Sequence, residues 1–230
     1  MKEPSPAHVK RRERILFAAL QVGLKRGLAA THMDEIAQDA GVSKGTLYNF
    51  FESREHLIVE AVLFAHTQSV TFHQNVDDAE VPPHARLWAL IESQAESFDQ
   101  VVLRFPMTTQ AWSLAAPGTE VHSRLGSGLN EIFMGYRRKV SDLLSLAQLA
   151  GTVRADVNVN VLAATWVATY NGLLYRACFD EQGDDSLSTK EGVRQALGWL
   201  LEASSRRCGK PCFGSLQNWQ FPRVGYRLGA

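Results

Sequence analysis

The stretch of sequence that decides the fold is MDEIAQDAGVSKGTLYNFF, residues 33–51. Its apolar positions recur at helical spacing and predict two short helices, at 33–40 and 44–51. Gly41 lies between them, where a sharp turn needs a residue that tolerates positive φ. Ser43 precedes the second helix and is a good N-cap. Two short helices joined by a tight turn form a helix-turn-helix, whose second helix enters the major groove of DNA.

The packing of this motif separates buried from outward positions. Val42 and Leu47 are expected to fill the small core beneath the turn, and the small side chain of Ala37 lets the two helices approach closely. A helix of this length is about 12 Å long, which fits the major groove. The side chains left facing outwards are Lys44, Thr46, Tyr48 and Asn49.

Three of these outward side chains have a chemistry that suits DNA. Lys44 can donate to guanine O6 and N7 or to a phosphate, and Asn49 can pair with adenine N6 and N7. The hydroxyl of Tyr48 suits a phosphate oxygen. The alternatives are ordinary surface roles: Asn49 as solvated helix surface, and Tyr48 as a packing residue with its hydroxyl in water.

Longer helices are predicted on both sides of the motif. The apolar stripe before it indicates a helix at about 8–25, and Ser53 is the expected N-cap of a helix at about 54–75. Thr31 precedes Asp34 by three residues, which approximates a capping box at the start of the first short helix.

The stretch from Arg14 to Leu57 resembles the N-terminal domain of the TetR/AcrR family of transcriptional regulators. The matching residues are Ile15-Leu16, Ala18-Ala19, Gly27, Thr31, Met33, Glu35-Ile36-Ala37, the unbroken run from Ala40 to Tyr48, Phe51, Ser53-Arg54-Glu55 and Leu57. The resemblance implies that the helix at 44–51 reads the major groove. It also implies phosphate or sugar contacts for Thr31, Ser43, Thr46, Tyr48 and Arg54, and places Lys44, Gly45 and Asn49 within reach of base edges.

Two positions depart from the family pattern. Position 50 is commonly His or Tyr, which can bond a phosphate, whereas Phe50 can give only van der Waals contact. Position 54 is commonly Lys, and Arg54 keeps the charge while adding a bidentate option.

Charge is unevenly distributed, although the net charge of the chain is zero. Residues 1–54 hold nine Lys and Arg against six Asp and Glu, a balance of +3, so the remainder carries −3. A basic head on an acidic body suits a protein whose N-terminal end alone meets phosphate. The basic cluster at 10–14 either contacts phosphate or only solubilises the first helical turns.

The rest of the chain also has a helical pattern, without convincing strand-like alternation. Val81-Pro82-Pro83 is the clearest break and our predicted domain boundary. Helices are expected beyond it at 84–104, 107–115, 119–149, 158–180 and 188–207. We therefore predict an all-α fold: a three-helix helix-turn-helix DNA-binding domain at 8–54, a connecting helix at 55–80, a helical domain at 81–208 and an irregular tail at 209–230.

The resemblance implies that the helical domain at 81–208 dimerises through its last two long helices. Residues 162–174 are apolar on most of the helix circumference, so this helix must be covered on both sides. Its own domain would cover one side and a second copy of the chain the other. The residues expected at this interface are Leu162, Trp166, Leu173, Val193, Leu197 and Leu201.

The resemblance also implies a small-molecule effector in the same domain, whose identity the sequence leaves open. Ligand pockets are mostly apolar with a few polar groups, although aromatic residues at helical spacing are more often ordinary core. The candidate pocket residues are Phe98, Phe105, Met107, Trp112, Phe133, Tyr136, Trp166 and Tyr170.

The sequence carries no motif for catalysis or for a cofactor. GxSxG, HExxH, P-loop and dinucleotide fingerprints are absent, so we expect no catalytic residue, no cofactor and no enzyme activity. Cys178, Cys208 and Cys212 lack the paired spacing of a structural zinc site, so no metal is expected. The chain has no apolar run of about 18 residues and no apolar signal region, which predicts a cytoplasmic protein without membrane contact.

These observations predict a ligand-responsive repressor that binds a palindromic double-stranded DNA operator as a homodimer. An activator or an architectural DNA binder on the same fold is the first alternative. An enzyme with an incidental helix-turn-helix is a remote one.

Overall fold

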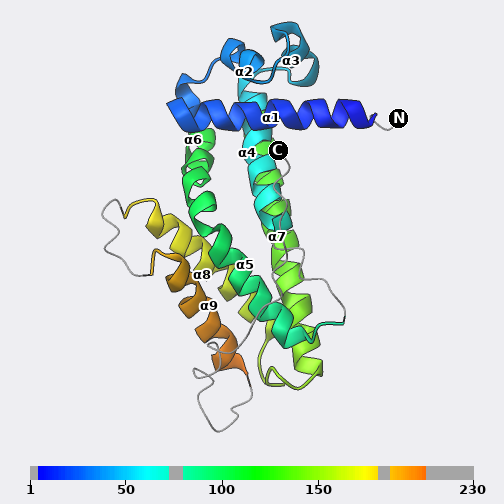
Figure 1. Cartoon of the computed structure of the whole chain (residues 1–230), viewed down its shortest axis with the longest axis vertical. Coiled ribbons are helices and arrows are strands. Elements are labelled where there is room, and N and C mark those ends of the chain that lie inside the picture. Colours follow the sequence, from blue (N-terminus) through cyan, green and yellow to red (C-terminus); the bar gives the residue numbers. More distant parts are fainter. Residues whose placement is uncertain (1–4, 73–79, 181–186, 206–230) are drawn as a thin grey trace.

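The computed structural model describes residues 5–72, 80–180 and 187–205. These residues are helical almost throughout, which confirms the predicted all-α fold (Figure 1). The elements are α1 (Pro6–Arg26), the 3₁₀ turn η1 (Leu28–Ala30), α2 (Met33–Asp39), α3 (Lys44–Phe50), α4 (Arg54–Phe72), α5 (Pro83–Arg104), α6 (Pro106–Leu114), α7 (Glu120–Leu149), α8 (Val159–Ala177) and α9 (Lys190–Ser204).

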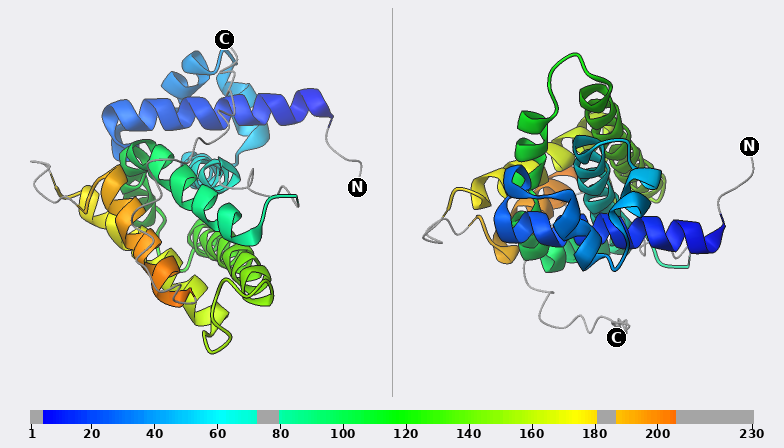
Figure 2. Two further views of the ribbon diagram at one scale, coloured as in Figure 1. Left: turned by 60° about the horizontal axis from the view of Figure 1, so that its bottom comes forward. Right: turned by 90° about the horizontal axis from the view of Figure 1, so that it is seen from above.

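The molecule is elongated, with a small helical head at one end of a longer helical body (Figure 1). The head contains α1, α2 and α3, and α1 lies across the end of the body (Figures 1 and 2). From the head, α4 runs into the body and packs along α7. Helices α5, α8 and α9 pack together farther from the head. Within the described residues, no helix is both long and apolar enough to cross a bilayer.

The helix limits agree with the predicted ones to within a few residues, because local signals set most of them. Ser5 caps α1 by accepting from the backbone N–H of His8, and Gly27 ends the helix at φ 80°. The Asn158 side chain caps α8 by accepting from the backbone N–H groups of Asn160 and Val161. The predicted irregular tail at 209–230 lies outside the described residues.

Two apolar clusters form the core. The first cluster contains residues of α1, α2, α3, α4, α6 and the beginning of α7, and includes Leu47 of α3, Leu57 of α4, Met107 of α6 and Leu125 of α7. The second joins α5, the rest of α7, α8 and α9 around the fully buried Trp166. The first cluster contains residues on both sides of the predicted boundary at residue 81, so the packing does not divide the chain at that point. The predicted domain limits stay a prediction.

The predicted dimer residues lie mainly in the second cluster, which corrects that part of the sequence interpretation. Leu162 is half-buried and Leu173 almost fully buried. Four others have no exposed surface within a single chain, so their side chains cannot be covered by a second copy: Trp166, Val193, Leu197 and Leu201. The error has a simple cause, since a helix that is apolar nearly all round does not reveal which side faces its own domain.

Candidate nucleic-acid interface

The turn between α2 and α3 has the predicted geometry. Gly41 adopts φ 61°, a conformation that costs glycine little because it has no Cβ. Val42 then donates its backbone N–H to the carbonyl of Ala37 at 3.0 Å. The Ser43 hydroxyl accepts from the backbone N–H of Thr46 at 3.1 Å, which confirms Ser43 as the N-cap of α3.

Burial on α3 agrees with the predicted division for Leu47, Lys44, Tyr48 and Asn49, but not for Thr46, which was expected to face outwards. Leu47 is fully buried beneath the turn, and Phe51, directly after the helix, is also buried. Thr46 is half-buried, and its hydroxyl lies 2.8 Å from that of Ser43. The positions exposed to solvent are Ser43, Lys44, Gly45, Tyr48 and Asn49, which form a single polar surface that we call the α3 surface.

Lys44 has a partner within the head that sequence reasoning missed. Its Nζ lies 2.9 Å from Oδ1 of Asp34, which stands in the first turn of α2. The hydrogen bond to Asp34 raises the pKa of Lys44 above its usual value. Both side chains are well exposed, so the pair is screened by solvent and a phosphate can compete for Lys44.

Thr31 does not lie on the α3 surface, and its predicted role in DNA binding is wrong for this conformation. The residue is fully buried, and its hydroxyl donates to the carbonyl of Gly27 at 3.0 Å. The predicted capping box is also wrong, since His32 is the N-cap of α2 and makes no side-chain cap bond. The spacing from Thr31 to Asp34 was correct for a capping box, but the preceding 3₁₀ turn holds the threonine hydroxyl away from α2.

Arg54 is committed to the interior of the head. Its Nε donates to the carbonyl of Thr31 at 2.6 Å, and its Nη2 donates to the carbonyls of Leu28 and Ala29 at 2.6 and 2.8 Å. Its Nη1 reaches the carboxylate of Glu55 at 3.1 Å. These contacts engage the Nε–H, both Nη2 donors and one Nη1 donor of a group with five N–H donors. The geometry is that of a side chain that holds η1 in place, rather than one that is free to bind phosphate.

Phe50 supports the neighbouring end of α1. Its ring lies 4.5 Å from that of His8 and 6.2 Å from that of Phe51, measured between centroids. The first turns of α1 are thereby held beside the C-terminal end of α3. Phe50 thus contributes aromatic packing at the position where the family commonly has His or Tyr.

The basic residues of the first helix separate into two groups. Arg12 points inwards, where its guanidinium lies over the Phe51 ring at 5.5 Å and pairs with the buried carboxylate of Glu60. Lys10, Arg11 and Arg14 are exposed to solvent on α1. These three add positive charge to the surface of the head.

Glu60 ties the head to the body. It lies on α4 with 7% of its surface exposed, and its carboxylate accepts from Arg12 of α1 and, at 2.7 Å, from Nε of Arg124 of α7. A buried carboxylate is costly unless it is paired, and here both oxygens have a cationic partner. The orientation of α1 is therefore coupled to that of α7 through one side chain.

A sequence model described as "Bacterial regulatory proteins, tetR family" matches residues 15–61, which contain this whole helix-turn-helix. The helix-turn-helix segment is thus similar to that of TetR-family regulators. The chain is similar to the HTH-type transcriptional regulator YerO of Bacillus subtilis, at 34% identity over 91 residues, which are 39% of this chain and 32% of YerO. It is also similar to the HTH-type transcriptional repressor DhaR of a Mycobacterium species, at 27% identity over 168 residues, which are 72% of this chain and 81% of DhaR.

A solved structure of a transcriptional regulator from Saccharomonospora viridis, in complex with choline, has the same fold as this chain. It superposes with a TM-score of 0.69 over 86% of this chain and 100% of that one, at 20% identity. The relatives carry the names of transcriptional regulators and not of enzymes. The chain spans about a third of the length of YerO.

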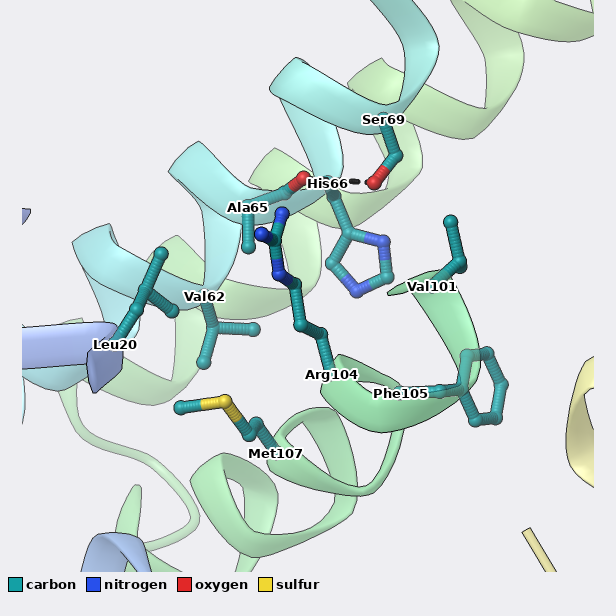
Figure 3. Close-up of a pocket in the computed structure, with 9 residues that line it drawn as sticks. All are labelled: Leu20, Val62, Ala65, His66, Ser69, Val101, Arg104, Phe105 and Met107. Carbon is teal, nitrogen blue, oxygen red and sulfur yellow. Dashed lines mark hydrogen bonds between the residues drawn. The ribbon is translucent and has the colours of Figure 1, made fainter. Parts of the chain in front are cut away.

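The predicted pocket residues do not form one group in the structure. Phe105 and Met107 line a pocket at the junction of head and body (Figure 3), and Phe133 contacts His66, which lines the same pocket. Trp112 is partly exposed and packs against His122. The remaining four lie together in the second core cluster: Phe98, Tyr136, Trp166 and Tyr170.

The cluster around Trp166 contains one polar side chain with a free donor. The Trp166 indole N–H donates to Oε1 of Gln94 at 3.0 Å, and both residues are fully buried. Nε2 of Gln94 has no hydrogen-bond partner among the described residues. Burial raises the pKa of Tyr136 and of Tyr170, so both phenols stay neutral and can donate.

The cysteines add no metal site within the part of the chain that the structure describes. No group of three metal-ligating side chains gathers there. Cys178 is half-buried and free of any disulfide, while Cys208 and Cys212 lie outside the described residues.

Proposed function

We propose that this protein is a transcriptional repressor that binds a palindromic operator as a homodimer and responds to a small molecule. The observation that carries the proposal is the α3 surface: a capped short helix with Lys44, Tyr48 and Asn49 exposed together, in the segment that matches the TetR family. A helix so placed can lie in the major groove with its side chains against base edges.

The proposed contacts follow from exposure. Lys44, Gly45 and Asn49 face bases, while Ser43, Thr46 and Tyr48 contact phosphate or sugar. Thr31 is excluded by its burial, and Arg54 acts through η1 by positioning the head. The exposed cations Lys10, Arg11 and Arg14 supply sequence-independent attraction to phosphate.

The proposed dimer surface is the outward side of α8 and α9, which lie together on one side of the body (Figure 2). Along α8 the exposed residues follow helical spacing and are mostly apolar or small: Val161, Thr165, Ala168, Gly172 and Tyr175. Trp199 projects from α9 with 64% of its surface exposed. Exposed aromatic groups beside a stripe of small residues suit close packing against a second pair of helices.

The effector is proposed to bind within the body or at its junction with the head. DhaR is named as a repressor, and the structure from Saccharomonospora viridis contains choline, which supports the same general behaviour for this chain. Two candidate places for the effector lie among the described residues. One is the neutral cluster around Gln94, whose Nε2 can donate a hydrogen bond, and the other is the pocket lined by Phe105 and Met107. We also propose that the protein acts in the cytoplasm, in the same compartment as the operator DNA that it binds.

Selection of bound sequences from a random pool of duplexes, with the full chain, tests this function. We expect enrichment of an inverted repeat whose half-sites are separated by about one helical turn or a multiple of it. Asn49→Ala should change the enriched sequence at one position in each half-site. An equal loss on all sequences would remove Asn49 from the base-reading set, and a pool without any enrichment would contradict the proposed function.

An activator on the same fold remains the second candidate, since DNA binding alone does not set the direction of regulation. Comparison of transcripts with and without the protein separates the two. A rise in the transcripts of genes next to the selected sites, when the protein is removed, supports repression.

A further inference from the structure

The two acidic residues in the first turn of α2 have different partners. Glu35 pairs with Arg26 of α1, with 2.6 Å between Oε1 of the glutamate and Nη1 of the arginine. Asp34 instead reaches the start of α3, where its Oδ1 and Oδ2 lie 2.9 and 3.0 Å from Nζ of Lys44. The Asp34 side chain has 71% of its surface exposed, and that of Lys44 has 52%. Both charges are therefore accessible to a partner that lies against the α3 surface.

The ion pair leaves hydrogen-bonding capacity on both of its members. A lysine ammonium has three N–H donors, so Lys44 keeps two when one is bonded to Asp34. An ionised carboxylate has about four acceptor positions, so Asp34 also keeps free ones. Because exposed ion pairs are weak, the two side chains can adjust to a third group at little cost. Towards DNA, the pair thus offers two donors beside an acceptor.

A G·C base pair presents the complementary pattern in the major groove. Guanine presents the acceptors N7 and O6, and cytosine presents the donor N4 beside them. A Watson–Crick hydrogen bond joins O6 to N4, and such N–H···O bonds are about 2.9 Å long. Nζ of Lys44 and Oδ1 of Asp34 are also 2.9 Å apart, so this donor and this acceptor can meet O6 and N4 side by side.

The pattern of an A·T base pair fits the ion pair less well. Adenine presents the acceptor N7 and the donor N6, and thymine presents the acceptor O4 and a methyl group. If Asp34 accepts from N6, Lys44 can reach only one of the two flanking acceptors, and the other lies against the carboxylate. One donor of the ammonium then stays unused and two acceptors repel each other, so the ion pair favours G·C.

We propose that Asp34 and Lys44 together read one G·C base pair in each half-site, with Lys44 donating to N7 and O6 of the guanine and Asp34 accepting from N4 of the cytosine. The inference rests on the proposed function, since it assigns one base pair of the operator. Asp34 is thereby a specificity-determining residue, although it lies on α2 and not on α3. Its negative charge weakens the attraction to every duplex, and its bond to cytosine offsets part of that loss only at the correct base pair.

Binding of the full-length protein to a modified duplex tests this assignment. Selection from the random pool, repeated with Lys44→Ala, first locates the base pair whose preference depends on Lys44. The cytosine of that pair is then replaced by N4-methylcytosine, in which a methyl group takes the place of the N4 hydrogen that does not pair with guanine. We expect the unchanged protein to bind this duplex at least about fivefold more weakly, because a hydrogen bond to a charged group is lost. Asp34→Ala should bind both duplexes equally.

Substitution in the protein measures the same contact independently. Asp34→Asn should lower the preference for G·C over A·T at this base pair by at least about fivefold, because its affinity rises less for the selected duplex than for the A·T duplex. Asp39→Asn is the matched control: it removes the same charge from an exposed position at the other end of α2 and should keep the preference.

Several results would overturn the assignment. These are the absence of any base pair that depends on Lys44, a dependent base pair other than G·C, equal binding of the unchanged protein to cytosine and N4-methylcytosine duplexes, and an unchanged preference in Asp34→Asn. Each of them leaves the proposed function intact, because the selection will already have shown sequence-specific binding. A pool without any enrichment contradicts the proposed function, and the assignment with it.

Discussion

At the scale of single residues, Asp34 and Lys44 form an ion pair at the edge of the α3 surface. A phosphate or a guanine competes with Asp34 for the Lys44 ammonium, and the Asp34 carboxylate also repels the DNA backbone. Asp34→Asn should therefore raise the affinity for any duplex by several-fold. The plot of log K against log salt should steepen by up to about 1, as expected for one more available cation. Titration of a fixed duplex over a range of salt concentrations measures both effects.

Asp39→Asn is the matched control for this prediction. Asp39 is exposed at the other end of α2, and its substitution removes the same charge without touching Lys44. If both variants bind DNA equally well, general charge explains the gain and the pair with Lys44 does not limit binding.

His66 makes the stability of the protein sensitive to acid. Burial lowers its pKa from 6.5 to about 4, so between these values the unfolded chain takes up a proton that the folded protein does not. The free energy of unfolding must then fall as the pH drops through this range. His66→Gln should make that fall less steep, although His84, whose pKa burial also lowers, keeps part of it. Urea unfolding at a series of pH values provides the measurement, and identical slopes for the two proteins would contradict it.

Residue roles were predictable where they depend on neighbours in the chain. Ser43 and Ser53 cap the helices that follow them, as predicted, because each hydroxyl reaches a backbone N–H three residues ahead. The role of Arg54 was not predictable in this way. Its carbonyl partners lie more than twenty positions earlier in the chain, and only the folded head brings η1 to it.

At the scale of elements, two glycines of α7 lie in contrasting surroundings: one packs closely against α4 and the other has open space around it. A Cβ at Gly128 would lie 2.6 Å from a methyl group of Leu63 on α4, whereas a Cβ at Gly135 would meet nothing within 4 Å. Gly135→Ala should stabilise the protein by about 0.5–1 kcal/mol through helix propensity. Gly128→Ala should instead destabilise it by about 1–3 kcal/mol, because the buried Leu63 has little room to move. Thermal unfolding of the two variants is the measurement, and equal stabilisation would show that α4 and α7 are not in tight contact.

Helix limits were predicted well, because caps, prolines and periodicity are local signals. The direction that each helix faces was predicted less well. Residues of α8 and α9 chosen for the dimer surface proved to be core, since apolar character alone does not separate a face that packs in the chain from one that packs on another.

At the scale of the whole molecule, the outward side of α8 and α9 predicts a dimer that one charge can disrupt. Trp199→Glu places a carboxylate at the centre of the proposed interface and should convert the dimer into a monomer at micromolar concentration. Phe17→Glu is the control, because Phe17 is also exposed and aromatic but lies on α1 in the head. Light scattering after size-exclusion chromatography gives the mass directly. A Trp199→Glu protein that keeps the mass of a dimer would place the interface elsewhere.

The sequence by itself determined the all-α class, the position of nearly every helix and the helix-turn-helix with its exposed residues Lys44, Tyr48 and Asn49. These features depend on neighbouring residues, because capping, glycine turns and apolar periodicity act over one or two helical turns. Only the tertiary structure decided that Thr31 is buried, that Arg54 holds η1, and that Arg104 lies beside His66 in an apolar pocket. Each of these depends on groups distant in the chain, whose approach is set by how whole helices pack.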